Sequence, residues 1–197
     1  MFVNKPCAAG CGKPAITGNN LCFIHLANPE QELARIYQYI ADERTIRDLN
    51  VSAVRFENID FSGKHFYGCN FKDALFINCD FSNVKIRMSF FDFANFNNCS
   101  FFKADMQFLS FAGTSIDNIS FEDSEIVHVN FEGAVITKSS FTNSNLYNSR
   151  FISADINETD FINCNLKRVY YASAKQKNVL FKSSNTAEAV FESEDNG

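Results

Sequence analysis

The chain has 197 residues, a formal net charge of −5 at pH 7, 23 Phe and no Trp. This length suits one extended domain with a small appendage, and the negative charge disfavours nucleic acid as a partner. No apolar stretch reaches the roughly 18 residues of a membrane span, and the N-terminal residues contain no apolar signal-peptide core. We therefore expect a cytoplasmic protein with no membrane contact.

Residues 1–27 contain three of the seven cysteines, in a spacing typical of a metal site. Cys7, Cys11, Cys22 and His25 form the order C-x3-C-x10-C-x2-H. Three thiolates and one imidazole match the tetrahedral coordination of Zn²⁺ and leave no open position, which predicts a structural zinc ion. A segment this short has too little apolar surface to fold alone, so the metal would stabilise it. Unrelated thiols in an unstructured tail are the alternative interpretation.

The same segment resembles a known small motif. Cys11-Gly12-Lys13-Pro14 and Leu21-Cys22-Phe23-Ile24-His25 are similar to the zinc knuckles of some phage and bacterial proteins. Such knuckles occasionally lie beside nuclease or DNA-binding modules. The resemblance therefore implies a zinc ion and admits nucleic-acid contact as one use of the segment.

A helix is expected directly after the cysteine-rich segment. Asn28 and Pro29 have the residue types of an N-cap and of a first helical position. Apolar residues then follow at helical spacing over about a dozen residues, namely Leu33, Ile36, Tyr37 and Ile40. The open end of a β-helix exposes strand edges, so we expect this helix and the cysteine-rich segment to cap the first coil. Residues 28–53 would then form a helical cap and lead-in to the repeat that follows.

A large apolar residue occupies every fifth position within residues 54–193, with lapses at Gln176 and Thr186. A period of five matches neither helix nor strand, so it indicates a repeating architecture. Most repeats have a small residue two positions earlier, and the other three residues mostly suit turns and solvent. A short strand and a tight turn every five residues would close a square coil after four repeats, with coils stacked about 4.8 Å apart.

Large residues one coil apart sort into four columns. One column, from Phe61 to Phe181, is Phe throughout, and the opposite column, from Phe71 to Phe191, is aromatic throughout. The other two columns become mostly aliphatic. One corner repeats Asn, whose stacked amides can bond from coil to coil, at Asn58, Asn78, Asn98 and Asn118. The sequence therefore predicts an all-β square rod with two opposed aromatic walls.

The repeat units resemble those of the pentapeptide-repeat family, whose repeat is approximately Ala-(Asp/Asn)-(Leu/Phe)-x-x. Ala94-Asn95-Phe96-Asn97-Asn98 and Ala154-Asp155-Ile156 match it closely. The resemblance covers residues 54–193 and leaves residues 194–197 as a tail. It implies a right-handed quadrilateral β-helix of about seven coils, preceded here by the small zinc-binding and helical cap.

The repeat shows little sign of catalytic chemistry. No Cys or Ser stacks beside a His in the adjacent coil, so no nucleophile–base pair is evident. Asp60 and Asp80 stack one coil apart, but Asp at this position suits bonding to turn amides. Four cysteines take the small inward position and are interpreted as reduced packing residues, namely Cys69, Cys79, Cys99 and Cys164. We expect a protein that is not an enzyme.

Charges divide the repeat along its length. Six acids and no base lie between Lys103 and Lys138, whereas five bases and no acid lie between Asp160 and Glu188. The basic end supplies four candidate partner-binding residues, Lys167, Arg168, Lys175 and Lys177.

Several apolar side chains are predicted to point outward from the third and fourth coils. They are Met88, Phe90, Phe93, Phe102 and Phe108. Neighbouring exposed aromatics are typical of a contact surface. The surface would take a partner protein, a second copy of the chain or the chain's own N-terminal segment.

These features lead to three functional hypotheses. The first is a non-enzymatic protein-interaction scaffold whose partner the sequence does not identify, with an end-to-end homodimer left open. Some pentapeptide-repeat proteins mimic duplex DNA and bind or protect DNA gyrase, so the resemblance makes a topoisomerase binder the alternative. Here the acids fall on several corners, the far end is basic and no loop interrupts the repeat. A weaker alternative is direct nucleic-acid binding through the knuckle and the basic C-terminal coils.

Overall fold

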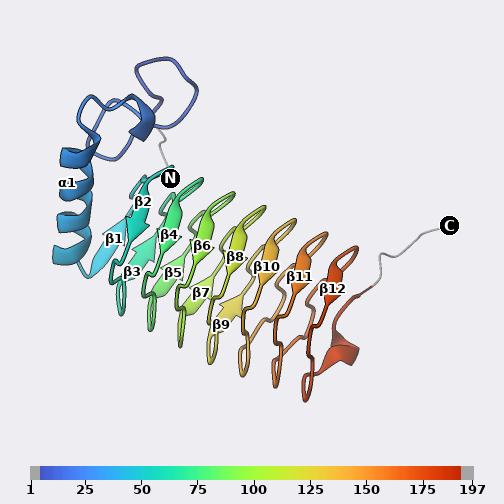
Figure 1. The fold of residues 1–197 in the computed structure, drawn as a ribbon. Coiled ribbons are helices and arrows are strands. Elements are labelled where there is room, and N and C mark those ends of the chain that lie inside the picture. The colour runs from blue at the N-terminus through green and yellow to red at the C-terminus, as the bar shows by residue number, and fades with distance from the viewer. Residues whose placement is uncertain (1–4, 192–197) are drawn as a thin grey trace.

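The computed structural model describes residues 5–191, which form a straight solenoid with a helix at its N-terminal end (Figure 1). Short 3-10 helices lie at Phe23–His25 (η1) and Thr186–Glu188 (η2), and α1 spans Pro29–Asp42. No helix in this range is long and apolar enough to cross a membrane. The strands are β1 (Thr45–Arg47), β2 (Arg55–Glu57), β3 (His65–Tyr67), β4 (Leu75–Ile77), β5 (Lys85–Arg87), β6 (Asn95–Asn97), β7 (Asp105–Gln107), β8 (Ser115–Asp117), β9 (Glu125–Val127), β10 (Val135–Thr137), β11 (Asp155–Asn157) and β12 (Lys175–Lys177).

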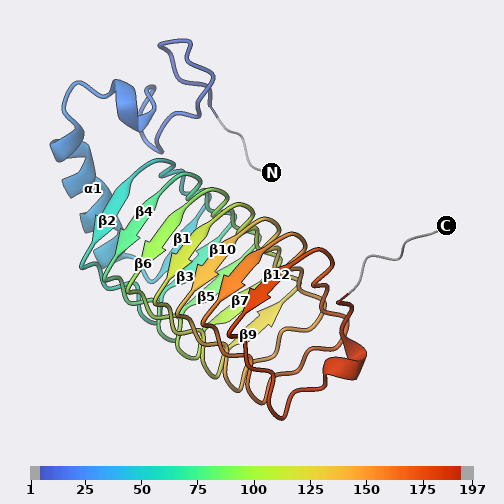
Figure 2. The same ribbon diagram turned by 45° about the vertical axis from the view of Figure 1, so that its right-hand side comes forward.

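The strands form two parallel sheets on opposite sides of a square coil (Figure 2). One sheet has the order β1-β3-β5-β7-β9 and the other β12-β11-β10-β8-β6-β4-β2. Partners in the ladder are one coil apart, as in Phe56↔Phe76 and Ile86↔Met106. The predicted quadrilateral β-helix of about seven coils is thereby confirmed.

The four sides of the coil are numbered here in chain order. The first face carries the column from Phe71 to Tyr171, the second face the β2 sheet, the third face the column from Phe61 to Phe161, and the fourth face the β1 sheet. The first and third faces hold only isolated bridges, such as Asn70↔Phe90 and Asp80↔Ser100. The expectation of a strand on every side is wrong for these two faces, because a turn follows the central residue directly.

Each corner of the coil has a left-handed residue. Positive φ recurs at every fifth position from Asp48 to Ser183. Most of these residues are Asn, Asp, Gly or Ser, as at Asn58, Asn78 and Gly63. Asn, Asp and Gly adopt positive φ at lower cost than bulky side chains do, so the polar residues between the apolar positions are what make the corners.

Stacked rings fill the core along two walls. Phe81 and Phe101 have centroids 4.5 Å apart with planes 3° from parallel, and Phe131 and Phe151 are 4.8 Å apart on the opposite wall. The predicted aromatic walls are confirmed. The four small inward cysteines are buried and free, and burial raises the pKa of Cys69 to about 12. These thiols are therefore packing groups.

Helix α1 covers the N-terminal end of the rod, as predicted. Asn28 caps it by accepting a hydrogen bond from the amide of Gln31, and Pro29 follows at the first position. Ile36 and Ile40 are buried against the first coil. The coil itself begins at β1, whose residues pair in parallel with β3.

Lys64 lies two residues before Phe66, at a position of the repeat that usually points inward and holds a small residue. The pattern alone does not explain a lysine there. Its Nζ donates to the carbonyl oxygens of Ala41 and Glu43 at 2.8 and 3.0 Å. These carbonyls lie at the C-terminal end of α1, where a cation complements the helix dipole. The lysine is tolerated because no earlier coil lies beneath it, and it fastens the helix to the rod.

The C-terminal coils are less regular, at the two lapses of the sequence pattern. Gln176 lies in β12, whose three residues are all exposed. Thr186 begins η2 on the fourth face, where β9 is the last strand and Asn145 and Asn165 form only isolated bridges. The predicted tail, residues 194–197, lies outside the described residues.

Tyr171 is expected to destabilise the rod relative to Phe. Its side chain is fully buried in the aromatic column, and its hydroxyl has no hydrogen-bond partner among the described residues. A buried unpaired hydroxyl costs about 1–3 kcal/mol. Tyr171→Phe should therefore raise the free energy of unfolding by about 1–3 kcal/mol in urea denaturation. Tyr170→Phe, on the outside of the same coil, is the control, and a less stable Tyr171→Phe protein would contradict the prediction.

Candidate functional site

The four predicted metal ligands lie together at one point. The ligand atoms of Cys7, Cys11, Cys22 and His25 all lie within 4.8 Å of one another. His25 Nδ1 is 3.5 Å from Cys7 Sγ and 3.3 Å from Cys22 Sγ, and the Sγ atoms of Cys11 and Cys22 are 3.6 Å apart. Tetrahedral coordination with bonds of about 2.0–2.3 Å separates ligand atoms by roughly 3.3–3.8 Å. The cluster can hold one metal ion.

Local backbone bonds bring these ligands together. The amide of Cys7 donates to Lys13 O, and that of Gly10 donates to Cys7 O, so the first two cysteines lie on one tight loop. The 3-10 helix η1 follows Cys22 directly and sets His25 beside it. The amide of Cys22 also donates to Cys7 Sγ, which lowers the pKa of Cys7 to about 6. A lowered pKa favours the thiolate, the form that ligates a metal.

The cysteine-rich segment is joined to the first coil. Ile16 is 1% exposed and belongs to the rod's core cluster. The backbone amide of Asn50 donates to Thr17 Oγ1 at 2.7 Å, and the backbone amide of Thr17 donates back to Asn50 O at 3.0 Å. Residues 15–17 therefore cover part of the first face as an additional coil would. The sequence analysis expected this segment to belong to the cap of the repeat, but it did not single out the apolar pair Ala15-Ile16 that makes the contact.

The outward apolar candidates lie mainly at the two edges of the first face. Met88 and Phe108 occupy the corner between the fourth and first faces and are 60% and 57% exposed. Phe93 lies at the next corner, is 63% exposed, and has its ring against Gly113 one coil on. Phe90 lies between these corners with Lys72 Nζ 5.1 Å from its ring centroid. These four surround one stretch of the first face.

Phe102 does not join the other four. It is half-buried beside the corner between the third and fourth faces, on the far side of the fourth face from Met88. Its ring contacts Lys103, whose Nζ is 4.9 Å from the centroid. The five outward candidates are therefore four neighbours and one separate residue.

A continuous row follows the corner between the fourth and first faces. The rings of Phe108 and His128 stack at 4.9 Å with planes 9° from parallel. Tyr147 meets His128 edge-on at 5.8 Å, and Arg168 donates to the Tyr147 hydroxyl at 3.2 Å. The row thus joins an apolar candidate, Phe108, to a basic candidate, Arg168, that are sixty residues apart in sequence.

The four basic candidates do not form one patch. Lys167 and Arg168 lie on the fourth face and its corner with the first face, whereas Lys175 and Lys177 lie in β12 on the second face. The acids of the middle coils are also dispersed, since Asp117 belongs to β8 on the second face and Glu125 to β9 on the fourth. The acids therefore make no stripe of the kind that DNA mimicry needs.

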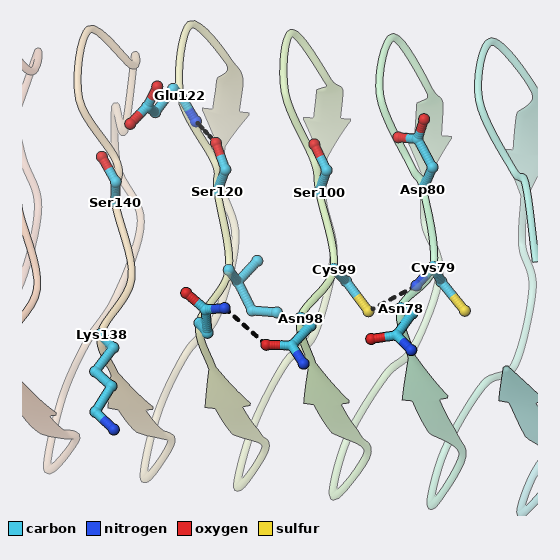
Figure 3. Close-up of a pocket in the computed structure, with 12 residues that line it drawn as sticks. Asn78, Cys79, Asp80, Asn98, Cys99, Ser100, Ser120, Glu122, Lys138 and Ser140 are labelled. Atoms are coloured by element: carbon cyan, nitrogen blue, oxygen red, sulfur yellow. Dashed lines mark hydrogen bonds between the residues drawn. The ribbon is translucent and has the colours of Figure 1, made fainter. Parts of the chain in front are cut away.

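A shallow polar groove of about 530 Å³ follows the third face (Figure 3). Its floor includes Cys79 and Cys99, and Asn118 donates to Asn98 Oδ1 at 2.7 Å along its edge. Asp80 accepts a hydrogen bond from the amide of Ser82 at 2.8 Å, as Asp60 does from Ser62. Both carboxylates therefore bind turn amides, as expected for Asp at this position of the repeat.

Comparison with known families agrees with the fold. A model described as a pentapeptide repeat region matches residues 49–131, and one described as pentapeptide repeats matches residues 115–151 and 130–168. The chain belongs to the pentapeptide-repeat family. No curated protein matches the sequence.

Solved structures of pentapeptide-repeat proteins are also similar. A trypsin-treated variant of QnrB1, a plasmid-mediated fluoroquinolone resistance protein, is 22% identical with a TM-score of 0.48 over 70% of this chain and 82% of that chain. A protein of the Arabidopsis thaliana thylakoid lumen is 28% identical with a TM-score of 0.30 over 41% and 59%. HetL of the cyanobacterium Nostoc is 12% identical with a TM-score of 0.28 over 81% and 95%.

Proposed function

We propose that this chain is a non-enzymatic, cytoplasmic protein-interaction scaffold that binds a partner along the edges of its first face. The observation that carries the proposal is the placement of Met88, Phe93 and Phe108. All three are more than half exposed, and all three stand at left-handed corners with φ between 50° and 59°.

Neither solvation nor backbone conformation favours these side chains at these positions. Left-handed φ costs a residue with a bulky side chain about 1–2 kcal/mol, and Asn or Gly avoids much of that cost. Exposed apolar surface adds no burial energy to the rod. The fold itself would be served better by the Asn found at corners such as Asn98 and Asn143. Strained, exposed apolar residues of this kind are typical of binding sites.

The proposal predicts that binding and stability respond in opposite directions at these corners. Met88→Asn/Phe108→Asn should reduce the amount of partner protein captured from source-cell extract by about tenfold or more, because apolar anchors dominate interface energies. Thermal stability should stay equal or rise, because Asn suits positive φ. Quantitative affinity capture and thermal melts measure the two effects.

Lys103→Asn/Lys138→Asn is the matched control. Both lysines are also left-handed corner residues, with φ of 55° and 49°, but they stand on other corners of the coil. This variant should retain capture. Equal capture by the wild type and both variants would contradict the proposed surface.

We further propose that the metal ion of the Cys7–Cys11–Cys22–His25 cluster is structural Zn²⁺. Three thiolates and one imidazole are a soft donor set that Zn²⁺ prefers, and the four ligands leave no open coordination position. Elemental analysis of purified protein should find about one zinc per chain and less than half of that in Cys11→Ser. Less than about half an equivalent in the wild type would contradict the assignment.

Binding to DNA gyrase is the alternative function, and supercoiling assays separate it from the proposal. The dispersed acids give no duplex-like stripe, so we expect no effect of the protein on gyrase supercoiling even in large excess. Dose-dependent inhibition, or protection from a quinolone, would favour the alternative.

A further inference from the structure

One edge of the rod carries no acidic residue from the coil of Tyr67 to the coil of Arg168. The edge consists of three adjacent outward columns, taken one coil at a time. They are Tyr67, Arg87, Gln107, Val127, Tyr147 and Lys167 on the fourth face, Gly68, Met88, Phe108, His128, Asn148 and Arg168 at the corner, and Asn70, Phe90, Ser110, Asn130, Arg150 and Tyr170 on the first face. The three columns contain no Asp or Glu although the whole chain has a net charge of −5.

The two ends of this acid-free edge differ in chemistry. Met88 and Phe108 make one end apolar, and both are more than half exposed. Arg150 and Arg168 make the other end cationic, and both are exposed. Arg87 and Lys167 are each paired with a carboxylate beside the edge, but within residues 5–191 neither Arg150 nor Arg168 has an ion-pair partner. The edge therefore presents an apolar anchor point and two guanidinium groups that have no carboxylate partner among the described residues.

The spacing of these two ends limits the partner. Phe108 and Arg168 are three coil steps apart, or roughly 14 Å at about 4.8 Å per step. An extended chain advances about 3.4 Å per residue, so the span corresponds to about four residues. Between the two ends, His128 and Tyr147 form a continuous aromatic surface.

A protein segment fits this edge better than a nucleic acid does. A nucleic-acid strand needs cations along its whole length, but the exposed cations without carboxylate partners are confined to one end of this edge. The Phe108 ring is stacked on His128, so that face is closed to a base. Aromatic residues, Met and Arg with few acids are also the composition of protein–protein interface cores.

We propose that the acid-free edge binds an extended acidic protein segment, with an apolar residue on Met88 and Phe108 and carboxylates about four residues away on Arg150 and Arg168. This inference rests on the proposed interaction function and names the chemistry of the partner. Arg–carboxylate pairs can be bidentate, which would fix the direction of the bound segment.

Synthetic peptides test the proposal directly, with binding measured by ligand-observed NMR. The probe is Ser-Phe-Ser-Gly-Ser-Glu-Glu-Ser, which places one Phe four residues before a pair of Glu. The comparison peptides replace both Glu with Lys or move the pair next to the Phe. We expect binding of the probe, loss of binding at high salt, and little binding of either comparison peptide.

Charge reversal on the rod supplies the matched control. Arg150→Glu/Arg168→Glu should weaken probe binding by about tenfold or more, whereas Lys175→Glu/Lys177→Glu, with the same change of charge on the second face, should not. Glu158 already occupies a left-handed corner with φ of 49°, so Glu is compatible with the fold at Arg168. Equal weakening by both variants would show nonspecific attraction and overturn the proposal, as would edge-dependent binding of oligothymidylate in preference to the probe.

The edge variants also separate this inference from the proposed function. If Met88→Asn/Phe108→Asn abolishes partner capture while Arg150→Glu/Arg168→Glu leaves both capture and probe binding intact, the interaction function stands and the acidic partner is wrong. If neither variant affects capture, both are wrong.

Discussion

Removal of the proposed metal ion is expected to unfold the cysteine-rich segment and expose the first coil. Within residues 5–27, only Cys7, Ala15, Ile16 and Cys22 are buried, so the proposed ion would supply most of the order of the segment. Structural Zn²⁺ contributes an apparent 10–16 kcal/mol, at about neutral pH, to the folding of small zinc modules. The packing of Ile16 on the core and the hydrogen bonds between Thr17 and Asn50 would be lost together, because both depend on the same ordered loop.

Two measurements follow this change in a sample treated with excess chelator. Hydrogen exchange at the Asn50 amide should accelerate strongly, while the amides of the middle coils keep their protection. Sedimentation should show concentration-dependent association, because the uncovered face presents a β edge. Cys22→Ser should already behave like the chelated protein and respond no further to chelator. Unchanged exchange at Asn50 after verified metal loss would show that the docking is independent of the metal.

Truncation of a central ring is the second change expected to have a large effect. Phe101 is stacked between Phe81 at 4.5 Å and Phe121 at 5.1 Å and is fully buried. Phe101→Ala should lower the free energy of unfolding by about 3–5 kcal/mol, since neighbouring rings held by the ladder cannot collapse into the cavity. Urea denaturation measures the loss.

Phe191→Ala is the matched control for the central ring. Phe191 belongs to the opposite aromatic column, stacks on Tyr171 at 5.0 Å and is 37% exposed. It has one stacking neighbour in place of two, so its truncation should cost less than half as much as that of Phe101. Equal costs at the two positions would mean that the rod does not behave as a chain of nearest-neighbour coils.

The core and the corners could be predicted from sequence because both follow from a strict local period. Each repeat makes the same backbone turn, so residues one coil apart meet whatever their type, and Phe61 stacks on Phe81 as the columns indicated. The metal ligands were predictable for a related reason. Their spacing reports chemistry directly, and the four atoms converge as the Cys₃His pattern requires.

Features outside the period could not be derived in the same way. Lys64 breaks the inward pattern because the first coil has a free end, and only the position of α1 shows that its ammonium binds helix carbonyls. The acid-free edge was missed for a different reason. Net charge and charge along the chain both average over four faces, so Arg168 was grouped with Lys175, its neighbour in sequence, instead of with Phe108, its neighbour on the rod.

The five-residue repeat also determines how insertions would change the surface. One added repeat supplies one side of the coil, so it would rotate everything downstream by a quarter turn while the same residues stay inward. An insertion between Phe108 and Arg150 would therefore carry the two arginines onto another side and separate them from the apolar anchor. Four added repeats would restore the alignment and lengthen the rod by about 4.8 Å. In such a protein, a change of chain length can redirect binding specificity while every buried residue is retained.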